Sequence, residues 1–381
     1  MVTKGSGGAG EPVSKMVAAL GDRRMDAPDA SITEIKLKDF RPEPMVKLPE
    51  HHPQRFPGPA IDIHNHLGRW LTKDWSVSDV GALLAMFDEV NIRGCVNLDG
   101  LWGEELENNL NRYDRAHPGR FATFCQLDWT EATKGAGWGE RLAASIRDSA
   151  KRGAKGLKLW KDVGLTRKDE NGKLFFFDDP RLKPMWEAVA EARIPVLVHT
   201  ADPAAFFQPL SATNERLEEI VNHPDWHFYG PEFPTMQFLL DALEHVIAAF
   251  PTIPFIGAHV GCYAEDLGWV DRMMTSYTNF NVDISARVAE LGRQPRATRR
   301  LVMKHPDRVL FGTDHFPPSA DAYRRYLRFL ATDDENFPYS GSNPPGSGRW
   351  RISGIDLPDD ILTIVTRTNA ERLVPSLART A

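Results

Sequence analysis

The chain has 381 residues, of which 42% are hydrophobic and 26% charged, enough for one large α/β barrel or two smaller domains. Its net charge of −6 does not fit a protein that binds nucleic acid or anionic membranes in general. Three cysteines without metal or disulfide spacing, no apolar signal core and no membrane span together predict a cytoplasmic protein. Its expected partner is a small-molecule substrate.

Residues 1–58 differ in composition from the rest of the chain. They are rich in glycine, proline and charge and show no sustained hydrophobic period. We therefore expect a flexible leader and an extended arm that wraps the domain or a partner subunit, which favours a homodimer. A single catalytic domain is expected over residues 59–381.

From residue 59 onward, short apolar runs alternate with longer amphipathic stretches. This rhythm is typical of βα units around a parallel sheet. Eight runs over about 270 residues match the size of a (β/α)₈ TIM barrel. A doubly wound sheet is the alternative, but no glycine-rich phosphate turn follows the first run. The predicted strands are 60–64, 94–98, 121–127, 155–160, 195–199, 254–259, 280–285 and 308–314.

Helices are predicted between these strands, most clearly over 179–193 and 236–250, where apolar residues recur at helical spacing. A last amphipathic helix, at the end of the chain, is expected on the outside of the barrel. The stretches 200–234 and 332–350 are too long for ordinary βα loops. Long insertions after strands 5 and 8 are expected to shape an active site or to act as a lid.

The active site of a TIM barrel forms at the carboxyl ends of its strands. "DIHNH" (62–66) places two histidines at the first of these ends, and alternation along a strand lets His64 and His66 share one ligand. Imidazoles together with a carboxylate suit Zn²⁺, with Mn²⁺, Fe²⁺ or Co²⁺ as further possibilities. The other polar residues at predicted strand ends are Lys158, His199, His259, Asp283, Arg287 and Asp314.

Four segments in this order carry a family resemblance: "DIHNH", "VLVHTAD" (196–202), "IGAHVG" (256–261) and "LFGTDHF" (310–316). They resemble the metal motifs of the amidohydrolase superfamily. More narrowly, they resemble its amidohydrolase-related branch (amidohydrolase 2) of metal-dependent TIM-barrel hydrolases, lactonases and non-oxidative decarboxylases. The resemblance extends over roughly residues 59–374.

The resemblance implies that His64, His66, His199 and Asp314 surround a single metal ion. His259 would lie beside the metal-bound water as a general acid/base, and Asp314 would accept the proton of that water. A bound metal lowers the pKa of such a water towards about 7. In some members of the superfamily, a lysine at the position of Lys158 is carbamylated and bridges two metals.

An uncarbamylated Lys158 would instead hold a substrate carboxylate. Arg287 and Arg69 are candidate anion anchors, because arginine binds a carboxylate in bidentate fashion, although surface arginines are common. Trp160 is a candidate wall of an aromatic substrate pocket, with simple loop packing as the alternative. Asp283 is expected to orient a histidine.

The sequence therefore favours hydrolysis of an amide, lactone or ester by metal-activated water. The alternative is non-oxidative decarboxylation of an aromatic or unsaturated acid, in which His259 or Asp314 delivers a proton to carbon at the same metal site. A third hypothesis is a metal-stabilised scaffold without catalysis, which would need a closed coordination shell. The long insertions around the predicted site argue against this third hypothesis.

Overall fold

The computed structural model describes residues 34–36, 39–40, 42 and 45–378, so most of the predicted leader lies outside the described residues. The chain divides into Met1–Lys47 and Leu48–Ala381, and the barrel belongs to the second unit. This unit begins before residue 59, because Phe56 is buried against Phe311, with ring centroids 5.2 Å apart. The backbone N–H of His51 also donates to Asp334.

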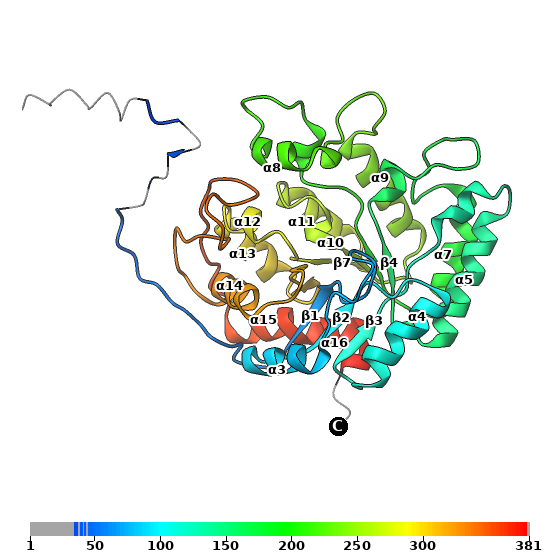
Figure 1. Cartoon of the computed structure of the whole chain (residues 1–381), viewed down its shortest axis with the longest axis horizontal. Helices are drawn as coiled ribbons and strands as arrows, with labels where there is room; N and C mark the ends of the chain where they lie inside the picture. The colour runs from blue at the N-terminus through cyan, green and yellow to red at the C-terminus, as the bar shows by residue number, and fades with distance from the viewer. Residues whose placement is uncertain (1–33, 37–38, 41, 43–44, 379–381) are drawn as a thin grey trace, which may run out of the picture. The chain divides into compact units, whose positions relative to one another are not determined.

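Eight parallel strands form the barrel, as predicted (Figure 1). Hydrogen bonds join neighbouring strands in the order β1-β2-β3 in one sheet and β4-β5-β6-β7-β8 in another. A bridge between Cys125 and Leu157 connects β3 to β4. The N–H of Ile63 donates to the carbonyl of Phe311 at 3.1 Å and thereby connects β8 to β1. The strands are β1 (Ala60–Asn65), β2 (Ile92–Asn97), β3 (Phe121–Thr123), β4 (Leu157–Leu159), β5 (Val196–Val198), β6 (Phe255–Gly257), β7 (Phe280–Asp283) and β8 (Val309–Leu310).

Helices follow the strands and cover the outside of the barrel. The predicted helix over 236–250 is α9, which begins where the Thr235 side chain accepts from the N–H of Phe238. The predicted helix over 179–193 is α7, preceded by the 3₁₀ turn η4. The larger helices are α3 (Val80–Val90), α4 (Gly103–Leu110), α5 (Trp138–Arg152), α7 (Lys183–Ala192), α9 (Met236–Ala249), α11 (Leu267–Ser276), α13 (Pro295–Lys304) and α14 (Ala320–Ala331).

Shorter helical segments complete the unit. One of them, η4, approaches α5 so closely that a Cβ on Gly139 would lie 1.9 Å from the carbonyl oxygen of Arg181, which explains the glycine. The shorter segments are η2 (Asn111–Arg115), η3 (Trp129–Thr133), α6 (Asp162–Leu165), η4 (Pro180–Leu182), η5 (Ala204–Phe207), α8 (Leu217–Asn222), η6 (Pro224–Trp226), α10 (Ala258–Gly261), α12 (Val288–Leu291), α15 (Asp359–Thr363), η7 (Ile364–Thr368), α16 (Asn369–Leu373) and η8 (Pro375–Leu377).

Alternation along the strands divides the buried side chains into two clusters. In β5, Val196 and Val198 belong to the larger cluster packed under the helices, whereas Leu197 belongs to a second cluster. The second cluster also contains Leu373 and Leu377, near the end of the chain. The last part of the predicted C-terminal helix thus packs against the second cluster and contacts β1 and β8, which differs from the exterior position predicted for it. Its first part agrees with the prediction, since Leu362 and Val365 belong to the larger cluster.

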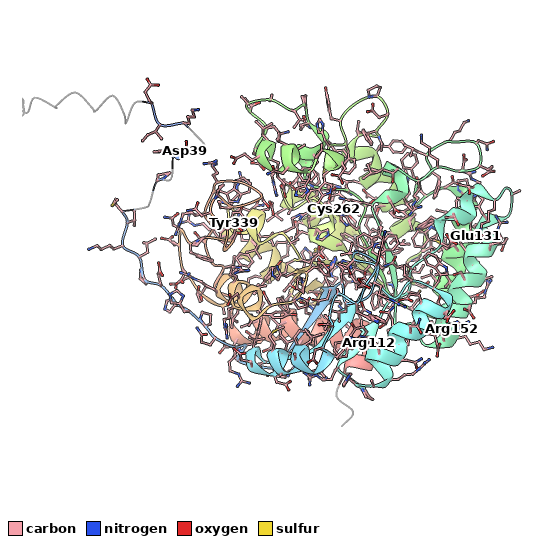
Figure 2. The ribbon with its side chains drawn as sticks, viewed as in Figure 1. Asp39, Arg112, Glu131, Arg152, Cys262 and Tyr339 are labelled. Atoms are coloured by element: carbon pink, nitrogen blue, oxygen red, sulfur yellow. The ribbon has the colours of Figure 1, made fainter. Side chains whose placement is uncertain are left out.

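Cys95, Cys125 and Cys262 are all free and buried. Figure 2 labels Cys262 in the central part of the barrel unit, among densely packed side chains. Among the described residues, no helix combines the length and the apolar character that crossing a membrane requires.

The two predicted insertions contact each other. The segment after β5 carries Glu218 and Glu219, and the segment between α14 and α15 carries Ser347 and Arg349. Arg349 forms a 2.6 Å ion pair with Glu218, and the Ser347 hydroxyl lies 3.5 Å from Glu219. The second insertion therefore follows the helix after β8 and returns to the first insertion.

Candidate metal centre

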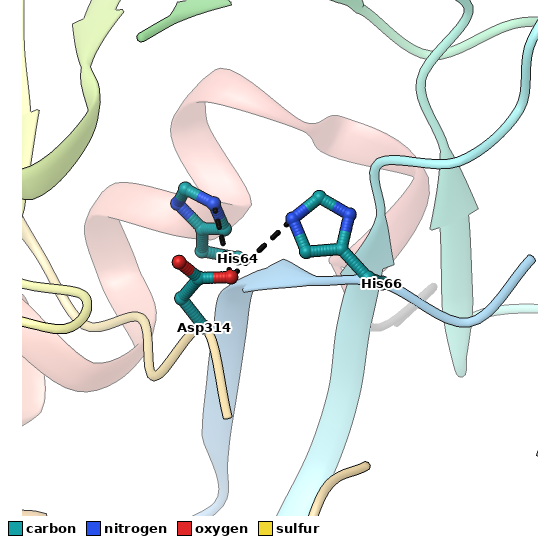
Figure 3. Close-up of side chains that lie close together, drawn as sticks. All are labelled: His64, His66 and Asp314. Carbon is teal, nitrogen blue, oxygen red and sulfur yellow. Dashed lines mark ion pairs between the residues drawn. The ribbon is translucent and has the colours of Figure 1, made fainter. Parts of the chain in front are cut away.

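Three side chains from the two ends of the barrel sequence meet at the carboxyl end of the strands. His64 and His66 come from β1 and the residue after it, and Asp314 follows β8. Asp314 Oδ1 lies 3.3 Å from His66 Nε2 and 3.6 Å from His64 Nε2 (Figure 3). The N–H of Asp314 donates to the His64 carbonyl at 2.9 Å, which fixes the two segments together.

The pairing of β1 with β2 is irregular at this point, with a register shift between Asp62 and Asn65. Such an irregularity re-aims the side chains of a strand, and it is common beside functional sites. Ile63 belongs to the interior cluster, yet the neighbouring His64 also faces the Asp314 carboxylate. The shift therefore positions His64 for the site.

Hydrogen bonds hold both histidines in one tautomer. His64 Nδ1 lies 2.9 Å from Asp283 Oδ2, and His66 Nδ1 lies 2.7 Å from Asp99 Oδ1. Each Nδ1–H therefore donates a hydrogen bond to a carboxylate, and each Nε2 faces Asp314 as the nitrogen available to a metal ion. A carboxylate behind an imidazole is the arrangement that metal-binding histidines use.

The residues present fit a divalent cation. His64 Nε2 is buried and has no hydrogen-bond partner among the described residues. The ligand atoms of His64, His66 and Asp314 lie within 4.8 Å of one another, close enough to share one ion. Imidazole and carboxylate donors suit Zn²⁺, Mn²⁺ and Fe²⁺.

The electrostatics of the trio, that is His64, His66 and Asp314, favour a positive charge. Burial alone would lower the pKa of His66, but the carboxylates of Asp99 and Asp314 raise it to about 9. Burial opposes ionisation of Asp314, yet His64, His66 and His259 hold the pKa of its carboxyl well below the usual range. Without a metal ion, the carboxylates thus stabilise an additional proton on His66. The same negative charges would stabilise a bound cation.

His259 lies on the other side of Asp314, with its Nε2 3.8 Å from Asp314 Oδ2. Burial, His199, Arg287 and His64 all hold the pKa of His259 well below its usual value. His259 and Val260 adopt left-handed backbone conformations, with φ of 58° and 61°. Asp314 also does, with φ of 52°. Such strained residues cluster at functional sites and cost about 1–3 kcal/mol each.

His199 occupies a different position from the trio. Its Nε2 lies 3.4 Å from Asp202 Oδ1, and its ring centroid is 4.5 Å from that of His259. Asp202 is in turn paired with Lys161. Burial lowers the pKa of His199 to about 4, so the ring is neutral. Its role as a metal ligand stays a prediction, because His199 is not part of the close group formed by His64, His66 and Asp314.

Lys158 and Trp160 border the trio from β4 and the residue after it. The Trp160 ring is stacked on His66, with centroids 5.0 Å apart and planes 29° apart. Lys158 Nζ lies 4.7 Å from the Trp160 ring centroid. Lys158 is only 1% exposed, and its amino group has no hydrogen-bond partner among the described residues.

The two arginines that the sequence singled out differ in their surroundings. Arg287 is buried at the start of α12, donates to the Ala286 carbonyl at 2.9 Å, and lies close enough to His259 to lower its pKa. Arg69 instead binds Glu105 through two nitrogens and lies over the Trp75 ring. Its guanidinium is already paired, so we leave Arg69 out of the proposed site.

Sequence reasoning missed several residues that support the site. Asp99 follows β2, so the strand-end rule used for the histidines would have selected it. Asp202 and Lys161 follow β5 and β4 in the same way. Ser285 follows β7 and contacts both His64 and His259. A serine carries no such signal in sequence, because its type is common in loops.

Comparisons with known proteins agree with the predicted family and with the barrel fold. A family model described as "Amidohydrolase" matches residues 61–375. No curated protein matches the chain.

Solved structures with a similar fold include several decarboxylases. A 2,6-dihydroxybenzoate decarboxylase from Rhizobium has a TM-score of 0.52 and 15% identity, with 84% of this chain and 99% of that chain covered. A dihydroxybenzoic acid decarboxylase from Polaromonas sp. JS666, solved with bound manganese and the inhibitor 2-nitroresorcinol, has a TM-score of 0.52 and 14% identity, with 85% and 98% covered. A 2,6-dihydroxybenzoate decarboxylase complexed with 2,6-dihydroxybenzoate has a TM-score of 0.54 and 14% identity, with 84% and 99% covered.

Proposed function

The chain belongs to the amidohydrolase family, and from this premise we propose that it is a metal-dependent decarboxylase of an aromatic or unsaturated carboxylic acid. The sequence favoured hydrolysis and left decarboxylation as the alternative. We now prefer decarboxylation. Similarity to the decarboxylase structures is a similarity of fold, which makes their reaction the first to test. The preference between the two reactions comes from the surroundings of the candidate centre.

The observation that carries the proposal is the buried amino group of Lys158. Burying an ammonium group without a partner is costly, so an anionic group of the substrate would supply the missing partner. The stacked Trp160 ring offers a flat apolar face beside it. A decarboxylase substrate always contains a carboxylate, whereas an amide, lactone or ester substrate need not.

In this proposal, His64, His66 and Asp314 hold one divalent metal ion, with His199 as a further candidate ligand. When bound, the ion acts as a Lewis acid that polarises substrate oxygens and stabilises negative charge. Zn²⁺ is the expectation from the donor set, and the bound manganese in the Polaromonas protein makes Mn²⁺ equally worth testing.

The reaction breaks the bond between the carboxylate and its carbon atom, and the electron pair stays on that carbon. CO₂ leaves, and the carbon takes a proton through His259 Nε2 or the Asp314 carboxylate. Because the pKa of each group is held well below its usual value, both are unprotonated at rest, and the group that delivers the proton first takes it from solvent. These two groups lie 3.8 Å apart, so one can pass a proton to the other before solvent restores it. Lys158 and Arg287 hold the anionic substrate.

A panel of substrates separates the two reactions. The protein loaded with Zn²⁺ or Mn²⁺ is incubated in D₂O with hydroxybenzoic and unsaturated acids, and in parallel with lactones, amides and esters of similar size. The proposal predicts CO₂ in equal amount to the acid consumed, with one deuterium on the carbon that lost it. Hydrolysis products without any CO₂ from the acids would contradict it.

Replacing Lys158 with methionine is expected to raise the KM for the acid substrate by about 10- to 100-fold, because a hydrogen bond to a charged group contributes about 1.5–3 kcal/mol. The kcat is expected to change much less, since the amino group does not take part in proton transfer. Steady-state kinetics measure both constants. Lys183→Met removes an exposed lysine of α7 and is the matched control. An unchanged KM in Lys158→Met would remove Lys158 from the substrate site.

The same lysine predicts a pH dependence. Burial lowers the pKa of Lys158 to about 8, against the opposing effect of nearby Asp314, Asp283, Cys262 and Asp99. Lys158 is therefore charged below about pH 8 and loses its charge above it, so the KM of the wild-type protein is expected to rise as the pH passes through about 8. This rise should be absent in Lys158→Met, where nothing titrates at that position.

Replacing His259 with asparagine is expected to lower kcat by about 10²- to 10⁴-fold while the metal is retained. An asparagine amide can reproduce the Nδ1–H that His259 directs to the Ser285 carbonyl at 2.9 Å, but it lacks the inward Nε2. Elemental analysis of the variant checks metal content beside the kinetics. Loss of the metal would make His259 a ligand instead.

A further inference from the structure

A single serine hydroxyl connects two histidines of the candidate centre. Ser285 Oγ lies 2.9 Å from His64 Nδ1 and 3.0 Å from His259 Nδ1. The same hydroxyl donates to Asp283 Oδ1 at 2.6 Å. Ser285 is fully buried, so water does not compete for these contacts.

The hydrogen-bond directions follow from the number of protons available. The one hydroxyl proton of Ser285 goes to Asp283, so its oxygen accepts from both Nδ1–H groups. Each ring has a second acceptor, namely Asp283 Oδ2 for His64 and the Ser285 carbonyl for His259, both at 2.9 Å. Both rings therefore carry their proton on Nδ1 and turn Nε2 towards Asp314.

The backbone holds this hydroxyl in place. Asp283 Oδ1 accepts from the backbone N–H groups of His259 and of Ser285, each at 3.0 Å. Asp283 is the last residue of β7, and His259 lies in the left-handed turn after β6. The serine thus lies between two strand ends, where both rings share its one hydroxyl oxygen.

We propose that Ser285 is a positioning residue that couples the orientation of His64 to that of His259. A displacement of one ring changes the acceptor available to the other, and residues in one hydrogen-bond network show such coupling. The coupling links a proposed metal ligand to a proposed proton donor. It rests on the proposed metal site, but not on which reaction the site performs.

Metal affinity tests this role without a substrate. The affinity of the purified full-length protein for Mn²⁺ or Zn²⁺ is measured by competition with a chromophoric chelator. Ser285→Ala is expected to bind the metal about 10-fold or more weakly, as is usual when a partner of a metal-binding histidine is lost. Thr298→Val removes another buried hydroxyl, which donates to the Leu291 carbonyl in α12, and is expected to bind as the wild type does.

A double-mutant cycle then separates coupling from a general loss of structure. His259→Leu removes the Nδ1–H that shares the Ser285 oxygen, and it is expected to change metal affinity by a different factor in the wild type and in Ser285→Ala, where that oxygen is absent. Equal factors, or a wild-type affinity in Ser285→Ala, would overturn the coupling. Metal binding without decarboxylation would count against the proposed function alone.

The tautomers provide a second test that needs no variant. Imidazole ¹⁵N chemical shifts of the wild-type protein are expected to show His64 and His259 protonated on Nδ1. Protonation of either ring on Nε2 alone would overturn the proposal, because Ser285 would then have no Nδ1–H group to accept from on that ring. This measurement remains decisive even when Ser285→Ala does not fold.

Discussion

Asp314→Asn is expected to lower turnover by about 10³-fold or more while leaving the fold intact. The substitution removes the negative charge that lies 3.3 Å from His66 Nε2 and 3.8 Å from His259 Nε2. The loss of one preorganised electrostatic group or one proton-transfer group costs about 10²- to 10⁴-fold, and Asp314 is proposed to serve in both ways.

The fold should tolerate this change for two reasons. Asparagine adopts the left-handed conformation of Asp314, with φ of 52°, as readily as aspartate does. The backbone N–H that binds the His64 carbonyl is also unaffected. Thermal unfolding and kinetics are measured together, with Asp321→Asn on the exposed side of α14 as the control. Undiminished activity in Asp314→Asn would refute the proposed mechanism.

His66→Asn is expected to weaken metal binding by more than about 100-fold. Loss of a residue that hydrogen-bonds a metal ligand already lowers metal affinity by about 10- to 100-fold, so loss of the ligand atom itself should lower it further. An asparagine amide can still donate to Asp99 in place of Nδ1, which limits damage to the buried carboxylate. The substitution therefore removes chiefly the Nε2 that faces Asp314.

The control for this variant is His245→Asn. His245 is exposed and pairs with Asp178 through Nδ1, so it offers the same hydrogen bond outside the candidate centre. Chelator competition is expected to give wild-type affinity for His245→Asn and greatly reduced affinity for His66→Asn. Equal affinities for the two variants would exclude His66 as a ligand.

The sequence predicts the barrel well because its strands are buried on both faces. Runs such as 195–199 have no polar interruption, and the observed β5 occupies the middle of that run. The predicted strands extend beyond the observed ones, because residues that leave the sheet, such as His199, are still buried as those within it are. The same strand-end rule brings His64, His66 and Asp314 together.

Other features depend on contacts between distant segments and cannot be read from the sequence. Arg69 has the right position for an anion anchor, but Glu105 lies 36 residues further along and occupies its guanidinium. His199 Nε2 lies 3.4 Å from Asp202 Oδ1 and is buried without a hydrogen-bond partner among the described residues, and no spacing rule predicts whether it binds the metal. Ser285 gains its importance only because the residues at the ends of β1, β6 and β7 meet at one end of the barrel.

The central claim is a single metal ion held by His64, His66 and Asp314. Elemental analysis of protein purified without chelator tests it most directly, by giving the number of metal ions per chain. The account predicts one equivalent of zinc, manganese or a similar divalent ion. Two equivalents would contradict the mononuclear centre and return Lys158 to the role of a carbamylated bridge, and none after reconstitution would contradict the metal site itself.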